Sequence, residues 1–220
     1  MTMLAMWLGE TSVALATDSN MTEFNEKSGS LTLLASDVKK LHVLPSGKVM
    51  FGIGFGDGPI NWLRSCPCDK GHDYPHHWGR CSEARNVDDL EQFIRRDLQD
   101  GGFPEKYHHL LELWIAGFNE QGTLGAFTLD GAGYREELTP GDAKFNEISA
   151  AVCARIKVPL IANPSTGTQL LKKKYYVLKE QMGSDADALK ETCQWLINLC
   201  EQHDCRFIGG ELRYHEIRRC

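Results

Sequence analysis

Short apolar runs separated by turn residues dominate the first part of the chain. Five such runs are residues 3–8, 12–17, 30–36, 40–44 and 48–55. Gly9-Glu10 separates the first two, and Pro45-Ser46-Gly47 precedes the last. Apolar runs of this length between turn residues are typical of β-strands joined by tight connections. The opening of the chain therefore predicts a meander of short, mostly antiparallel strands.

Apolar residues recur at helical spacing further along. After Asn86, a residue type that caps helices, four apolar residues share one face, and two aspartates occupy the first turn. The four are Val87, Leu90, Ile94 and Leu98. Residues 170–181 have helical character too, and Ser184 is expected to cap a further helix that ends near His203.

Strand-like segments follow the first helix and close the chain. Residues 110–118 and 125–130 flank Asn119-Glu120-Gln121-Gly122, a plausible hairpin turn, and residues 206–214 are expected to be a strand that contains Gly209-Gly210. This order of strands and helices favours the α+β class. It suggests antiparallel sheets packed between helical layers in one domain that spans residues 1–220.

Composition narrows the class of protein. The chain has 220 residues, of which 42% are hydrophobic and 25% charged, as expected of an ordinary globular domain. Its formal net charge of −6 argues against nucleic acid as a partner, because phosphate contacts need a basic face. No apolar run is long enough to predict a membrane span. The eight cysteines fit a reducing compartment better than a disulfide framework, so we expect a cytoplasmic protein.

A Cys- and His-rich insertion interrupts the pattern at about residues 64–85. Four of its side chains, Cys66, Cys68, His72 and Cys81, are of the types that bind zinc. The Cys-x-Cys spacing differs from the Cys-x-x-Cys spacing of common zinc knuckles. A structural zinc site and a metal-free loop with thiols therefore both remain open.

Thr2 is the first candidate for catalysis. A small residue after Met1 permits removal of that methionine, which would make Thr2 the N-terminal residue. A free N-terminal threonine carries its own general base, because its α-amine, with a pKa of about 7.7–8.0, belongs to the same residue as the hydroxyl. The alternative is an ordinary Met-Thr start without chemistry.

Asp18 and Lys40 form the second candidate group. Asp18 ends an apolar strand, and Lys39 and Lys40 point to opposite faces if their backbone is extended, so one of the two must face inward. An inward lysine needs a partner, and Asp18 is a candidate. Gly52, Gly54 and Gly56 alternate nearby, and alternating glycines indicate a close approach of backbones or a tight bend.

These features together resemble the proteasome β-type N-terminal-nucleophile (Ntn) hydrolases, especially the short bacterial and phage-type homologues. The resemblance is carried by Thr2, Ala16-Thr17-Asp18-Ser19, Val38-Lys39-Lys40-Leu41 and Gly52-Ile53-Gly54-Phe55-Gly56-Asp57, and more thinly by Asp204-Cys205-Arg206-Phe207-Ile208-Gly209-Gly210. It implies a four-layer αββα sandwich of antiparallel sheets and a self-compartmentalising threonine peptidase. It also implies a homo-oligomeric ring that acts on peptides or unfolded proteins without a required cofactor.

The resemblance also assigns roles to individual residues. It makes Thr2 the nucleophile, Lys40 the cation that lowers the pKa of the hydroxyl, Asp18 the partner of Lys40, and Gly54 the donor to the oxyanion. Ser165 and Asp204 match the supporting positions least well, and Ile208 stands where the family has serine before the final Gly-Gly. Whether an ATPase partner exists does not follow from the resemblance.

Two other functions stay open at this level. The departures around Ile208 and Met3 are compatible with a proteasome-like scaffold without peptidase activity that serves assembly or regulation. The insertion is compatible with a zinc-stapled binding module.

Overall fold

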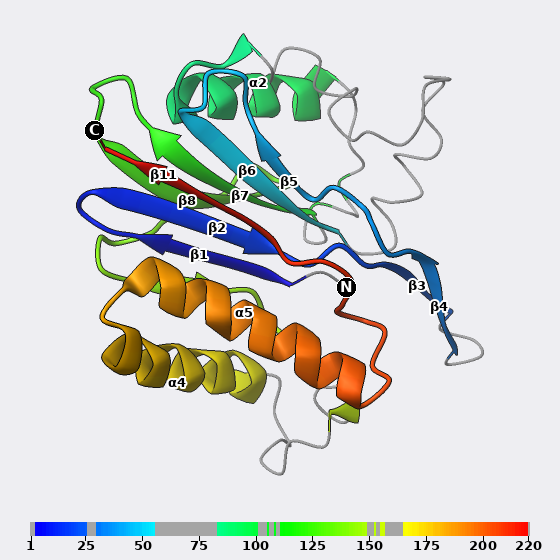
Figure 1. Ribbon diagram of the computed structural model, residues 1–220. Coiled ribbons are helices and arrows are strands. Elements are labelled where there is room, and N and C mark those ends of the chain that lie inside the picture. The colour runs from blue at the N-terminus through cyan, green and yellow to red at the C-terminus, as the bar shows by residue number, and fades with distance from the viewer. Residues whose placement is uncertain are drawn as a thin grey trace.

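The computed structural model describes residues 3–25, 30–55, 83–100, 105, 108, 111–148, 152, 155–156 and 165–219. These residues form a mixed α+β fold with antiparallel sheets, as the order of predicted elements indicates (Figure 1). The helices of this part of the chain are α2 (Val87–Asp100), α4 (Ser165–Met182) and α5 (Asp185–Gln202).

The strands form two larger sheets and one separate pair. One sheet has the order β10-β1-β2-β11, with strands Ala143–Phe145, Leu4–Leu8, Ser12–Thr17 and Arg213–Arg218. The other has the order β5-β6-β7-β8-β9, with strands Leu41–Val43, Val49–Phe55, Leu111–Phe118, Leu124–Asp130 and Arg135–Glu137. The pair is β3 (Met21–Asn25) with β4 (Ser30–Ala35).

Strands β1 and β2 are buried along their whole length because apolar groups cover both of their faces. They pair antiparallel with Leu4 opposite Thr17. Side chains on one face, Met3, Ala5, Trp7, Ala14 and Ala16, pack with α4 and α5. Those on the other face, Leu4, Met6, Leu8, Val13 and Leu15, pack against β6, β7 and β8. The continuous apolar runs seen in the sequence therefore serve two different cores.

The side chains of strand β6 also alternate between two cores. Val49, Phe51 and Ile53 pack with α2 and its neighbours, whereas Met50 faces the β1–β2 hairpin. Gly52 lies on the same side as Met50, and a Cβ atom there would stand 2.9 Å from Leu4 Cδ2. Glycine at position 52 thus lets the two sheets approach closely next to the end of β2.

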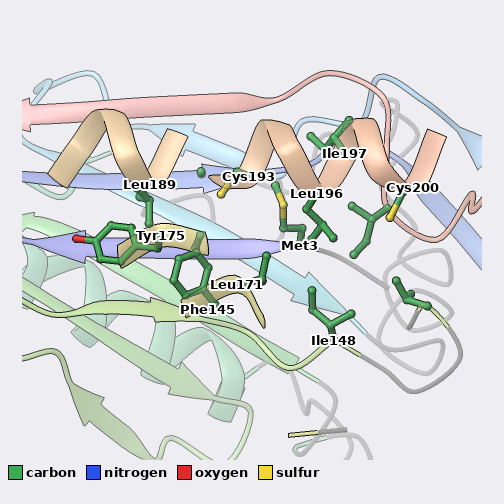
Figure 2. Close-up of a cluster of buried hydrophobic side chains, with 14 of the residues drawn as sticks. Met3, Phe145, Ile148, Leu171, Tyr175, Leu189, Cys193, Leu196, Ile197 and Cys200 are labelled. Carbon is green, nitrogen blue, oxygen red and sulfur yellow. The ribbon is translucent and has the colours of Figure 1, made fainter. Parts of the chain in front are cut away.

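Helix α5 begins as the sequence predicts. The Ser184 side chain accepts a hydrogen bond from the Asp187 backbone N–H, and the helix ends at Gln202, followed by His203. Its apolar face covers β1 and contacts α4 (Figure 2). Cys193 and Cys200 are part of this face, are buried and form no disulfide, so they pack as small hydrophobic residues of the core.

The closing strand differs from the prediction. Residues 206–212 are not a strand, and β11 begins only at Arg213, because the preceding segment turns through Gly210 with φ of +74°. Strands β3, β9 and β10 were not expected from the apolar pattern. The sequence also predicts a helix start at Gly56-Asp57-Gly58-Pro59, and this segment lies outside the described residues. Among the helices that are described, none has the length and apolarity to cross a lipid bilayer.

Candidate active site

Asp18 stands at the end of β2 and has no solvent exposure. Its Oδ1 accepts hydrogen bonds from Lys40 Nζ at 2.8 Å and from the Met3 backbone N–H at 2.9 Å. Its Oδ2 accepts from the Gly209 N–H at 3.3 Å. Three segments that are distant in sequence therefore meet on one carboxylate, and their donors replace the water that a buried charge loses.

Lys40 lies just before β5, and its side chain turns inward while Lys39 remains exposed. The residue is 5% exposed. The Lys40 carbonyl accepts a hydrogen bond from the Ile53 N–H at 3.0 Å, which fixes the residue against β6. Burial lowers the pKa of Lys40, and the charge and hydrogen bond of Asp18 act in the opposite direction. The Asp18 carboxylate is therefore what favours the protonated form of this buried amine.

Ser19 ties a second set of segments to the same place. Its hydroxyl donates to the Ser36 carbonyl at 2.5 Å and accepts from the Glu211 N–H at 2.8 Å. The backbone N–H groups of Ser19 and Asn20 both donate to the Gly209 carbonyl, at 3.2 Å and 3.1 Å. The Gly209 N–H thus donates to Asp18, and the Gly209 carbonyl accepts from Ser19 and Asn20, the two residues that follow Asp18.

Ser19 and Gly209 were not assigned a role from the sequence. The Gly209-Gly210 pair in the sequence could have indicated a turn here, but a strand was expected through this region. Ile208, at the position where the resemblance led us to expect a serine, has its side chain buried in the core beneath α5. Contact with Asp18 is made by backbone at this point, so an apolar side chain at position 208 is compatible with it.

The direction of the Gly54 N–H decides whether Gly54 can be the expected oxyanion donor. Gly54 lies opposite Glu112 where β6 pairs with β7. Along the same pair of strands, the Phe118 N–H donates to the Lys48 carbonyl, which shows that the backbone of Lys48 is directed toward β7. Because hydrogen-bonded positions alternate along antiparallel strands, the Gly54 N–H is directed toward β7. The N–H of Phe55 is directed to the opposite edge, the edge on which Ile53 bonds Lys40.

The remaining predicted site residues divide into two groups. Asp204 is exposed and pairs with Arg206 at 3.3 Å, so the structure does not bring it to Asp18, while Ser165 begins α4. Thr2 and the four expected zinc ligands, Cys66, Cys68, His72 and Cys81, lie outside the described residues. Within the ranges that are described, no three His, Cys, Asp or Glu side chains form a group that could hold a metal.

No protein-family model matches the chain, and no curated protein matches its sequence.

Proposed function

We propose that this chain is a threonine-type Ntn amide hydrolase that cleaves peptide bonds, with the four-layer αββα arrangement of that class. The packing of α4 and α5 on one sheet and of α2 on the other supports this arrangement. The observation that carries the functional proposal is the shared Asp18 oxygen. It holds a buried ammonium and also the backbone N–H of Met3, the residue that is covalently joined to Thr2.

The chemistry follows from the residue types. After removal of Met1, the Thr2 hydroxyl attacks the substrate carbonyl while the Thr2 α-amine takes its proton, directly or through one water. The Lys40 ammonium lowers the pKa of the hydroxyl, and Asp18 keeps this ammonium charged and oriented. The C–N bond of the substrate then breaks, the departing amine takes the proton from the Thr2 α-ammonium, and an acyl ester remains on the Thr2 oxygen. Water attacks this ester with the α-amine as base, and the ester bond breaks as the Thr2 oxygen regains a proton from the amine.

The oxyanion of this mechanism needs a backbone N–H on the Lys40 side of β6. Ladder geometry favours the N–H of Phe55 over that of Gly54, because Gly54 is directed to Glu112. We therefore assign the donor role to Phe55 within the proposal. A homo-oligomeric ring with peptide or unfolded protein as substrate remains part of the proposal through the family resemblance alone. A cytoplasmic location remains part of it because the cysteines fit a reducing compartment.

The pH dependence of peptide hydrolysis tests this function. We expect kcat/KM to rise with pH through about 7.7–8.0 as the Thr2 α-amine loses its proton and becomes a base. At higher pH the rate is expected to fall as Lys40 loses its proton. Since burial lowers the pKa of Lys40, this fall lies below the ordinary lysine value of about 10.4.

The profile is measured with fluorogenic peptides, with the Thr2→Ala variant as the blank at every pH. A rate that does not change between about pH 6 and pH 9 would contradict an α-amine base. A folded, Met1-free protein without turnover on any peptide would favour the inactive scaffold instead.

A further inference from the structure

Asn146 lies directly after β10, beyond the Ala5–Phe145 pair that ends the pairing of β10 with β1. At the next step the Asn146 N–H donates to the Leu4 carbonyl at 3.0 Å, and Asn146 Oδ1 accepts from the Leu4 N–H at 2.8 Å. Because a backbone N–H can only donate, the amide carbonyl oxygen is the atom that faces Leu4. One asparagine therefore satisfies both backbone groups of Leu4.

The side chain of Asn146 takes the place that its own backbone carbonyl would have in a regular ladder. Two residues of a hydrogen-bonded antiparallel pair would exchange their backbone N–H and carbonyl groups. The Asn146 carbonyl instead accepts from the Thr168 hydroxyl of α4, at 3.4 Å. The amide group thereby extends the hold on β1 by one residue toward Thr2 and connects this strand end with α4.

Leu4 also determines how β1 lies against β6. It has no exposed surface. A Cβ atom at Gly52 would stand 2.9 Å from Leu4 Cδ2, and one at Gly54 would stand 3.0 Å from Leu4 Cδ1. The residue whose backbone Asn146 holds is thus packed on the strand to which we assign the oxyanion donor, Phe55.

The N–H groups of Met3 and Leu4 are held by two side chains. The Met3 N–H donates to Asp18 at 2.9 Å, and the Leu4 N–H donates to Asn146 at 2.8 Å. Successive N–H groups of an extended strand point to opposite edges, so the two acceptors hold β1 from both sides. The strand end beside Thr2 cannot shift without losing one of these hydrogen bonds. Because the Asn146 amide is neutral, it adds no second negative charge near Asp18.

We propose that Asn146 is a positioning residue for the Thr2 nucleophile: by fixing Leu4, it sets the direction in which β1 presents Thr2 to the substrate carbonyl. This inference rests on the proposed function and deepens it. Asn146 acts through Leu4 and Met3 and transfers no proton. A misplacement of reacting groups by about 1 Å can cost about 10²-fold in rate, so a single lost anchor two residues from the nucleophile is expected to be visible in kcat.

Peptide hydrolysis by two variants of Asn146 tests the role, with each variant measured at its own pH optimum. Asn146→Ala removes the acceptor, and its kcat is expected to fall by about 10- to 100-fold with KM within about twofold, because Asn146 positions the nucleophile and not the substrate. Asn146→Asp keeps an oxygen for the Leu4 N–H and should recover most of kcat. A folded Asn146→Ala variant with the kcat of the wild type would overturn the proposal, as would a change in KM alone.

Asn119→Ala is the matched control. The Asn119 side chain also accepts a backbone N–H, that of Thr123 at 2.9 Å. Asn119 follows β7 at the end remote from Leu111, the residue that pairs with Phe55. Its variant loses the same kind of hydrogen bond, so urea denaturation should show a loss of stability comparable to that of Asn146→Ala, but kcat should not change. An equal fall of kcat in both variants would reduce Asn146 to a general contributor to stability.

Hydrogen exchange at the Leu4 amide tests the contact without peptidase activity. Exchange is expected to be faster in Asn146→Ala than in the wild type and unchanged in Asn119→Ala. Unchanged exchange in Asn146→Ala would refute the contact. A wild-type protein without turnover would refute the proposed function and the positioning role with it. An active wild type whose kcat survives Asn146→Ala would refute this inference alone.

Discussion

Asp18→Asn is expected to lower the free energy of unfolding by about 3–5 kcal/mol at pH 7, the cost of leaving a buried charge without its partner. Asparagine keeps the shape of aspartate and an oxygen for the Met3 N–H, but it removes the charge that compensates Lys40. The Lys40 side chain is 6% exposed and cannot regain water without moving. Urea denaturation measures the loss. Peptide hydrolysis should fall in parallel, because Lys40 would no longer be held charged.

The matched control is Asp204→Asn, since the Asp204 side chain is 79% exposed in its pair with Arg206. Its effect should stay within about 0.5 kcal/mol, as for other surface changes. In the double variant Asp18→Asn/Lys40→Met, part of the lost stability should return, because the uncompensated charge is gone. An Asp18→Asn variant as stable as the wild type would mean that the pair is not buried in solution.

Gly210→Ala is expected to cost roughly 3–5 kcal/mol of stability, in the range reserved for steric conflict in a packed site. A Cβ atom at Gly210 would lie 2.4 Å from Ser19 Oγ and 2.5 Å from the Ser36 carbonyl oxygen. The residue also has φ of +74°, which side chains disfavour. The added methyl group would therefore break the hydrogen bonds of Ser19 with Ser36 and Glu211, which join the end of β2 to the segment after α5.

Gly122→Ala separates strain from steric conflict. Gly122 has φ of +73°, almost the same conformation, but nothing lies within 4 Å of an added Cβ. Its cost should be about 1–2 kcal/mol, from the backbone conformation alone. The comparison is made by urea denaturation of both variants. Equal losses at the two positions would show that Ser19 and Ser36 do not pack against Gly210 as described.

Local pattern was sufficient to predict the hairpin and an inward lysine at residues 39–40, whereas the choice of Lys40 came from the family resemblance. The β1 and β2 runs are apolar on both faces, and the alternation of side chains along an extended segment leaves Lys40 inward when Lys39 is outward. Helix α2 begins after Asn86, whose side chain accepts from the Asp89 N–H at 2.8 Å, as its capping signal predicts. The hairpin, the alternation at residues 39–40 and the helix cap each depend on residues close together in the sequence, whereas the Asp18–Lys40 pair joins residues 22 positions apart.

Features that depend on distant partners could not be predicted in this way. Which edge of β6 the Gly54 N–H faces depends on the pairing of β6 with β7, a strand more than fifty residues further along the chain. The contact between Gly209 and Asp18 joins residues separated by 191 positions. The apolar residues of 206–212 fit a strand, but Phe207 and Ile208 pack beneath α5 and the backbone turns.

Covalent labelling with a peptide β-lactone or epoxyketone, read by intact mass and peptide mapping, tests the central proposal most directly. The expected product is a chain without Met1 that carries one probe on Thr2. Thr11→Ala, in the exposed turn after β1, should be labelled as the wild type is, and Thr2→Ala should not be labelled. Retention of Met1 in protein that hydrolyses peptides, or a probe attached to any residue other than Thr2, would contradict the proposed mechanism.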